Sequence, residues 1–157
     1  MTCTGSEAND IALRIAQTIT NAKGIISTNH TYHGNTALVS QLSDTNPSSS
    51  FSLNTFKRVF APDSYRLNGS KNLEEYSRSF AQDIERKINE FKKENIGFAG
   101  IILCPFFANE GFPNLPSGWL EPAQKIIKKH GGIIIADEVQ PGFGRLGSSM
   151  WSHDIIG

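Results

Sequence analysis

The chain of 157 residues has few cysteines, no excess of charge and no long apolar run. Two cysteines, Cys3 and Cys104, make no disulfide framework, so a reduced compartment is expected. The 15 Lys and Arg residues balance the 15 Asp and Glu residues, which argues against a nucleic acid or an anionic membrane as the partner. No apolar stretch approaches the roughly 20 residues needed to span a bilayer, and no basic and apolar leader opens the sequence. We therefore expect a cytoplasmic protein with the length of one domain.

Two familiar ligand-binding patterns are also missing. A glycine-rich loop of the form G-x-x-x-x-G-K-[ST], which cradles nucleotide phosphates, does not occur. His30 and His33 lie close together, but neither cysteine stands at a spacing that would complete a zinc site with them. The sequence therefore favours neither a nucleotide hydrolase nor a metalloprotein.

The most informative stretch is 133–147, IIIADEVQPGFGRLG. Its first four residues are a short apolar run that follows two glycines, which predicts a strand buried on both faces, as in a parallel sheet. Asp137 then falls at the carboxyl end of the strand, where open α/β sheets bind their ligands. Burying a carboxylate is costly unless a cation or several donors meet it. We therefore expect a positive group opposite Asp137.

Three interpretations of Asp137 and Glu138 compete. An apolar strand followed by Asp-Glu has the form of a Walker B element, but that interpretation requires the missing phosphate loop. The second is an aspartate that pairs with the protonated ring nitrogen of pyridoxal phosphate. The third is a strand-end acid that only caps a turn.

The beginning of the chain predicts a helix with an exposed N-terminus. Thr4 and Glu7 have the spacing of a capping box, and apolar residues recur at helical intervals from Ala8 to Ile19. The first amides of a helix lack internal partners, so the turn at Gly5 and Ser6 is also suited to an anion.

Strands and helices alternate along the rest of the chain. Short strands are predicted at 25–27 and 97–103, and a turn-rich loop at 43–55. An amphipathic helix is predicted over 73–91 and another from about 117 to 130, with Pro122 near its start. This alternation is typical of a parallel α/β sheet.

Three motifs taken together resemble the class III aminotransferases, which are pyridoxal-phosphate enzymes: TGSEAN at 4–9, YHG at 32–34, and DEVQ followed by GFGR and Leu-Gly from Asp137. Nearly the whole chain resembles a contiguous middle portion of that family. The resemblance implies an α/β fold of type I, with residues 1–157 forming part of the large cofactor domain, a mostly parallel sheet with helices on both faces. The family's N-terminal segment, its Schiff-base lysine segment and its small C-terminal domain are expected to be absent, so this fragment should not transaminate alone.

The same resemblance implies roles for individual residues. Gly5 and Ser6 would cradle the phosphate of pyridoxal 5'-phosphate. Tyr32 would stack on the pyridine ring, with His33 beside it. Asp137, the one catalytic residue expected in this chain, would keep the ring nitrogen protonated, and Gln140 would hydrogen-bond the ring hydroxyl. No metal has a role.

The implied reaction moves an amino group between an amino acid or amine and an oxo acid, both small molecules, in a homodimer. APDSYR at 61–66, together with GRLG followed by Trp151, is similar to the branch of alanine–glyoxylate aminotransferase type 2 and the phospho-lyases. A phospho-lyase, or an inert remnant of the family, is therefore the alternative.

Three departures from the family pattern bear on the substrate and on the charge of the site. Asn35 stands where ornithine and 4-aminobutyrate aminotransferases carry arginine, which counts against those two substrates. Cys104 replaces the glutamate of a Glu-Pro pair, and Ala108 replaces a glycine.

Overall fold

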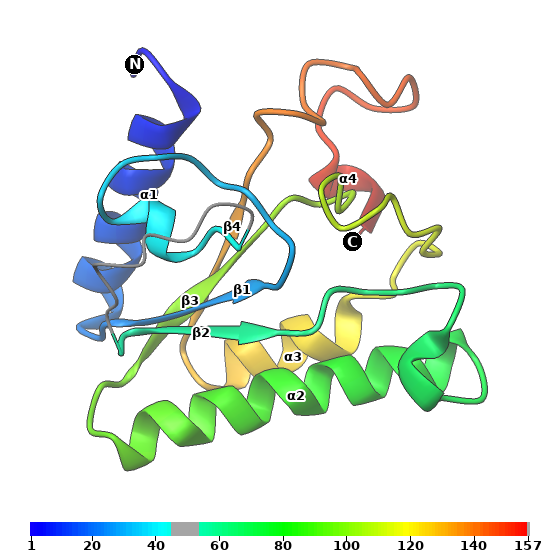
Figure 1. The fold of residues 1–157 in the computed structure, drawn as a ribbon, viewed down its shortest axis with the longest axis horizontal. Coiled ribbons are helices and arrows are strands. Elements are labelled where there is room, and N and C mark those ends of the chain that lie inside the picture. The colour runs from blue at the N-terminus through cyan, green and yellow to red at the C-terminus, as the bar shows by residue number, and fades with distance from the viewer. Residues whose placement is uncertain (45–53, 157) are drawn as a thin grey trace.

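The computed structural model describes residues 1–44 and 54–156, without the side chains of the last two of these. Parallel strands alternate with helices along the chain (Figure 1). The elements in chain order are α1 (Gly5–Thr20), β1 (Gly24–Thr28), η1 (Val39–Gln41), β2 (Phe56–Val59), η2 (Leu67–Gly69), α2 (Leu73–Lys93), β3 (Phe98–Leu103), α3 (Glu121–Lys129), β4 (Ile133–Ala136) and α4 (His153–Ile156).

Within residues 1–44 and 54–156, the strands form one four-stranded parallel sheet in the order β2-β1-β3-β4. Because the strands are parallel, all of their carboxyl ends lie at the same edge of the sheet. The chain leaves β1 toward β2 on one side, and β3 lies on the other side of β1. Open α/β sheets bind ligands at such a switch point. The α/β class and the parallel sheet predicted from the sequence are confirmed.

One face of the sheet is covered by α1, which begins at the predicted capping box. The Thr4 side chain accepts a hydrogen bond from the Glu7 amide, and the Glu7 side chain returns to the Thr4 amide. Leu13 of α1 packs with Ile25 of β1 and with other buried side chains, namely Val39, Leu42, Ala99 and Ile102. The isoleucines that defined the helical pattern, by contrast, are exposed: Ile11 by 39%, Ile15 by 52% and Ile19 by 69%.

The opposite face is covered by α2 and α3, which lie side by side beneath the sheet in Figure 1. Of the apolar positions that predict α2, Leu73 is partly buried and the others are buried, namely Tyr76, Phe80, Ile84, Ile88 and Phe91. Trp119 packs on this row, with its ring centroid 5.5 Å from that of Tyr76 and 5.1 Å from that of Phe80. Pro122 lies at the start of α3, as predicted. Helices therefore cover both faces.

The prediction that Ile133 to Ala136 would be buried on both faces is wrong. The strand forms as predicted, but within the described residues β4 pairs only with β3 and is the edge of the sheet. Ile134 is 40% exposed because no described element lies outside it. A run of isoleucines carries no information about which strand will lie at the edge.

Two further comparisons with the sequence prediction concern the region between β1 and α2. Strand β2 was not predicted, since its sequence FKRV holds two charged residues in a short segment. The loop predicted at 43–55 falls mostly outside the described residues. No helix in the described part of the chain combines the length and the apolar composition that a membrane crossing requires.

We predict that the exposed edge at β4 makes this chain self-associate. An apolar edge strand with free backbone groups pairs readily with other strands. Replacing Ile134 by lysine should raise the monomer fraction, because a charge at the edge opposes strand addition while its methylene stem still covers the apolar surface. Analytical ultracentrifugation over a range of concentrations measures this fraction.

Gln82→Lys is the matched control, since it adds the same charge at an exposed position on α2. Equal association of the two variants, or a wild-type chain that is monomeric with a sharp cooperative melt, would show that the β4 edge does not drive association.

Candidate functional site

A cavity of about 250 Å³ lies at the carboxyl edge of the sheet, where four separate segments meet. Its walls come from the start of α1, the loop after β1, the loop after β3 and the segment after β4. The residues that line it are Gly5, Ser6, Tyr32, His33, Gly34, Cys104, Asn109, Asp137, Val139 and Gln140. All the site residues predicted from the sequence are in this set, although they are distributed over most of the chain.

Asp137 is the buried acid of the cavity, with 7% of its surface exposed. Its Oδ2 accepts hydrogen bonds from Asn9 Nδ2 at 2.8 Å and from His33 Nδ1 at 2.8 Å. Its Oδ1 accepts a third from the Val139 amide at 3.1 Å. These donors supply the compensation that a buried carboxylate requires.

The donors also control the ionisation of Asp137. Burial raises the pKa of the carboxyl, but the hydrogen bond and charge of His33, with the Val139 amide and Asn9, outweigh burial and hold the pKa below its ordinary value. The pKa of this carboxyl in the unfolded chain is about 3.9, and it is lower in the folded chain. Above a pH of about 3.9, ionised Asp137 therefore stabilises the fold. This contribution is lost as the pH falls through the folded pKa. The site therefore holds a fixed negative charge at neutral pH.

His33 lies behind Asp137, with a fully buried side chain. An ionised carboxylate only accepts hydrogen bonds, so His33 Nδ1 carries the proton it shares with Asp137. The other ring nitrogen, Nε2, is 3.0 Å from Thr31 Oγ1. The His33 amide donates to Ser43 Oγ at 3.0 Å. The ring is therefore fixed in orientation and acts on the cavity through Asp137.

The other end of the cavity is formed by the first turn of α1. No described residue accepts a hydrogen bond from the amides of Gly5 and Ser6, as expected at a helix N-terminus. Ser6 Oγ accepts from the Asn35 amide at 3.1 Å, which leaves the hydroxyl proton free to donate. Gly34 has φ +131°, and a Cβ there would lie 2.4 Å from Ser6 Oγ, so only glycine permits this approach. This end presents several donors and a helix dipole, which suit an anion.

Tyr32 and Gln140 complete the walls between these two ends. Tyr32 is 42% exposed, which leaves its ring available to stack on a planar ligand. Gln140 is also exposed, and the Arg145 side chain fixes its backbone by donating to the carbonyl oxygens of Val139 and Gln140 at 3.2 and 3.1 Å.

Cys104 lies at the end of β3, on the wall of the cavity. Burial raises the pKa of its thiol to about 11, and the nearby charges of Glu110 and Asp137 add to the effect. The thiol is therefore neutral at pH 7. With cysteine at this position, Asp137 is the only acidic side chain among the described residues that line the cavity.

Asn9, Thr31 and Ser43 take part in the site but were not predicted as site residues. Asn9 also donates to the His33 carbonyl at 2.9 Å, so one amide group joins α1 to both Asp137 and the loop after β1. A signal was present in the sequence. Asn9, Leu13 and Ala16 follow helical spacing and are the buried residues of α1, and a polar residue in such a row indicates a polar partner.

Two other observations bear on where a ligand would bind. Among the described residues, no group of three or more His, Cys, Asp or Glu side chains could hold a metal ion. A larger cavity of about 470 Å³ lies beside residues 60–66 and the loop at 110–113. None of the predicted site residues lines it, so the smaller cavity is the candidate site.

The comparisons with known proteins agree with this geometry. The family model for aminotransferase class-III matches residues 1–157. The chain is 29% identical to ethanolamine-phosphate phospho-lyase homolog 1 of Caenorhabditis elegans, over 96% of the chain and 35% of that protein. It is 33% identical to an Arabidopsis thaliana protein named alanine–glyoxylate aminotransferase 2 homolog 2, mitochondrial, over 99% of the chain and 32% of that protein.

A comparison with a solved structure also places the chain among these relatives. A phospholyase from Arthrobacter in complex with phosphoethanolamine superimposes with a TM-score of 0.87 at 31% identity, covering 98% of this chain and 36% of the other. The chain thus spans about a third of the length of these relatives. The relatives belong to the branch that the sequence indicated. The match over all 157 residues, together with the shared fold, shows that the chain belongs to the class III aminotransferase family.

Proposed function

We propose that the chain binds pyridoxal phosphate in the 250 Å³ cavity and forms part of the large cofactor domain of a class III aminotransferase. The family and its structural neighbours depend on this cofactor. The observation that carries the proposal is Asp137, a buried carboxylate kept ionised by its donors at one end of a cavity whose other end is a free helix N-terminus.

The residues present fit the two ends of the cofactor. At the α1 end, the amides of Gly5 and Ser6 and the Ser6 hydroxyl would hold the phosphate, whose charge the helix dipole favours. At the β4 end, Asp137 would accept a hydrogen bond from the protonated pyridine nitrogen. Tyr32 would cover one face of the ring, and Gln140 would reach the ring hydroxyl.

The chemical role of Asp137 is to hold a proton on the ring nitrogen. When bound, pyridoxal phosphate supplies an electron sink for bonds broken at the amine-bearing carbon of the substrate. Opposite charges about 4 Å apart attract by roughly 4 kcal/mol at an effective dielectric near 20, which is about three pKa units. His33 and Asn9 keep the Asp137 carboxylate oriented and ionised for this purpose.

The reaction itself is proposed for a longer protein or an assembly. No lysine lines the cavity among the described residues, and no lysine follows Asp137 in the sequence. We propose that a segment outside this chain supplies the Schiff-base lysine and that the enzyme is a cytoplasmic homodimer. Its reaction would be amino transfer from an amino acid or amine to an oxo acid. Removal of phosphate from an amino phosphate is the second candidate, because two of the relatives described above are phospho-lyases or their homologues.

We predict that the isolated chain binds the cofactor without a covalent bond to one lysine. After incubation with pyridoxal phosphate, reduction with borohydride and digestion, mass spectrometry should find only scattered, substoichiometric adducts. A stoichiometric adduct on one residue, such as Lys23 or Lys125, would contradict this prediction and identify a lysine that serves the site within this chain.

We predict that Ser6→Asp weakens cofactor binding by at least tenfold, because a carboxylate there would face the phosphate and cancel the effect of the helix N-terminus. Titration of the chain with pyridoxal phosphate, followed by its absorbance or by tryptophan fluorescence, measures the affinity. Ser117→Asp is the control, since Ser117 is exposed and lies outside the cavity. The same loss in both variants would place the phosphate elsewhere.

In a complete enzyme, with the lysine and the remaining segments supplied from a close relative, Asp137→Asn should lose far more turnover than Gln140→Ala. The amide removes the charge that holds the ring proton, worth several kcal/mol, or a hundredfold or more in rate. Removing Gln140 costs one hydrogen bond of about 1 kcal/mol, or roughly fivefold. Comparable turnover of the two variants at saturating cofactor would show that Asp137 does not pair with the pyridine nitrogen.

A further inference from the structure

We propose that Glu138 is a positioning residue, which closes the loop at 139–151 and thereby holds Val139 and Gln140 on the wall of the cavity. This inference rests on the proposed function, because it assigns a role at the same site. Glu138 directly follows Asp137, but its carboxylate makes its contacts with the far end of the loop.

The Glu138 carboxylate accepts hydrogen bonds from two consecutive residues that lie 14 and 15 positions later in the chain. Its Oε2 accepts from the Ser152 amide at 3.1 Å and from Ser152 Oγ at 2.7 Å. Its Oε1 accepts from the His153 amide at 2.9 Å and lies 2.9 Å from His153 Nδ1. With four donors on one carboxylate, both ends of the loop are joined at a single side chain.

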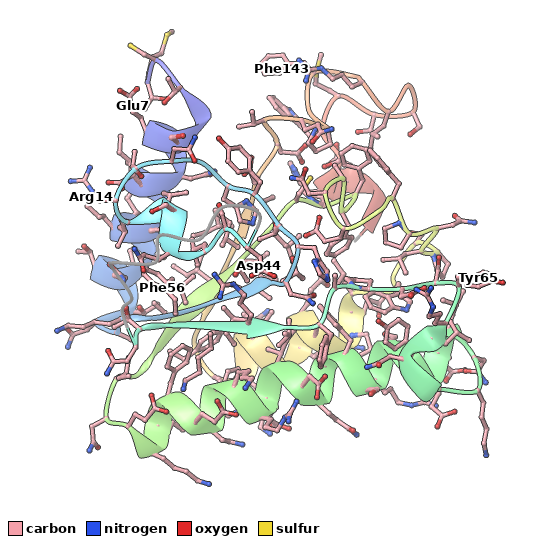
Figure 2. The ribbon with its side chains drawn as sticks, viewed as in Figure 1. Glu7, Arg14, Asp44, Phe56, Tyr65 and Phe143 are labelled. Carbon is pink, nitrogen blue, oxygen red and sulfur yellow. The ribbon has the colours of Figure 1, made fainter. Side chains whose placement is uncertain are left out.

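The rest of the loop has few other attachments. The Gly142 amide donates to the Glu138 carbonyl at 2.9 Å, and the Gly144 amide donates to the Met150 carbonyl at 3.0 Å. Phe143 packs on Trp151 with 5.0 Å between the ring centroids, yet Phe143 is 75% exposed and lies at the outer end of the loop (Figure 2). These contacts are within the loop itself, so its orientation relative to the sheet depends on its base.

The base of the loop is also a wall of the cavity. The Val139 amide donates to Asp137, and a Cβ on Gly5 would lie 2.6 Å from Val139 Cγ2, so Val139 packs directly against the first turn of α1. Arg145, farther along the loop, donates to the carbonyls of Val139 and Gln140. A loop released from Glu138 would therefore displace the residues that face both the ring and the phosphate.

Glu138 accepts all four hydrogen bonds because its side chain is an ionised carboxylate, which a neutral residue cannot replace. Burial raises the pKa of this carboxyl, but the Ser152 hydroxyl, the two backbone amides and His153 outweigh burial and hold the pKa below its ordinary value. The titratable groups beside the Glu138 carboxylate are His153 and Asp154, and Asp154 Oδ1 lies 3.6 Å from His153 Nε2. Glutamine in place of Glu138 would keep one acceptor oxygen but point an NH₂ group at two of the four donors.

The test uses the 157-residue chain with three substitutions. Glu138→Gln removes the charge, and Ser152→Ala removes one of the four donors. Glu74→Gln is the matched control, because it makes the same chemical change in an exposed ion pair with Arg78 on α2. Amide hydrogen exchange of the cofactor-free chain is followed by mass spectrometry over residues 139–153, with β3 as the internal reference. Titration with pyridoxal phosphate gives the affinity of each variant.

We expect exchange over 139–153 to become about tenfold faster in Glu138→Gln, with a smaller change in Ser152→Ala, none in Glu74→Gln, and none in β3 of any variant. Cofactor affinity should fall several-fold in the same order. Unchanged exchange in the loop, or an increase that β3 shares, would overturn the proposal. If Glu138→Gln does not fold, Ser152→Ala decides by the same criteria.

The two readouts separate this inference from the proposed function. A wild-type chain that does not bind pyridoxal phosphate would refute the proposed function, while the exchange data would still decide whether Glu138 closes the loop. A wild-type chain that binds the cofactor, with a Glu138→Gln variant that binds it equally well, would refute the positioning role and leave the proposed function intact.

Discussion

The hydrogen bonds that converge on Asp137 are the interaction on which the candidate site depends. Asn9 comes from α1, His33 from the loop after β1, and Val139 from the segment after β4, so one carboxylate joins three regions of the chain. A buried charge imposes a strict condition, because the loss of any donor leaves part of it uncompensated. Each of these donors is itself fixed by a further contact, as with His33 and Thr31. The position of the site residues therefore depends on the hydrogen bonds that compensate the charge of Asp137.

The parallel sheet explains why such distant residues meet. Every strand of the sheet ends at the same edge, and the loops after β1, β3 and β4 each place a residue in the cavity: Tyr32, Cys104 and Asp137. The start of α1 brings Gly5 to the same edge, since α1 lies on the face of the sheet and its chain continues into β1. In the proposed function, the phosphate and the ring of the cofactor would thus be bound at opposite ends of one small cavity. The segments that line this cavity also belong to the sheet and its covering helix or lead directly from them.

Much of this could be predicted from the sequence, and the failures have physical reasons. The α2 helix and the strand before Asp137 were predicted because their apolar patterns are long or uninterrupted, and the predicted residues Gly5, Tyr32 and Asp137 do line one cavity. The burial of β4 and of the isoleucine row on α1 was not predictable, since periodicity shows which residues are apolar but not which face another element covers. The contacts of Glu138 were not predicted because its partners lie beyond a loop, where no periodicity connects them.

The connection from Asn9 to Asp137 also has a consequence for how the chain acquires its shape. These two residues are separated by 128 positions, and His33 is 104 positions from Asp137. Contacts between residues so far apart in sequence form slowly, because a long loop must close before they contribute any stability. Helices have no such requirement, and the paired strands close shorter loops, as with Ile25 and Gly100, so the acid and its donors should be among the last groups to come together during folding. Competence to hold the proposed cofactor would then mark the end of folding, and a chain in which these contacts have not yet closed would carry most of its secondary structure before it carried a site.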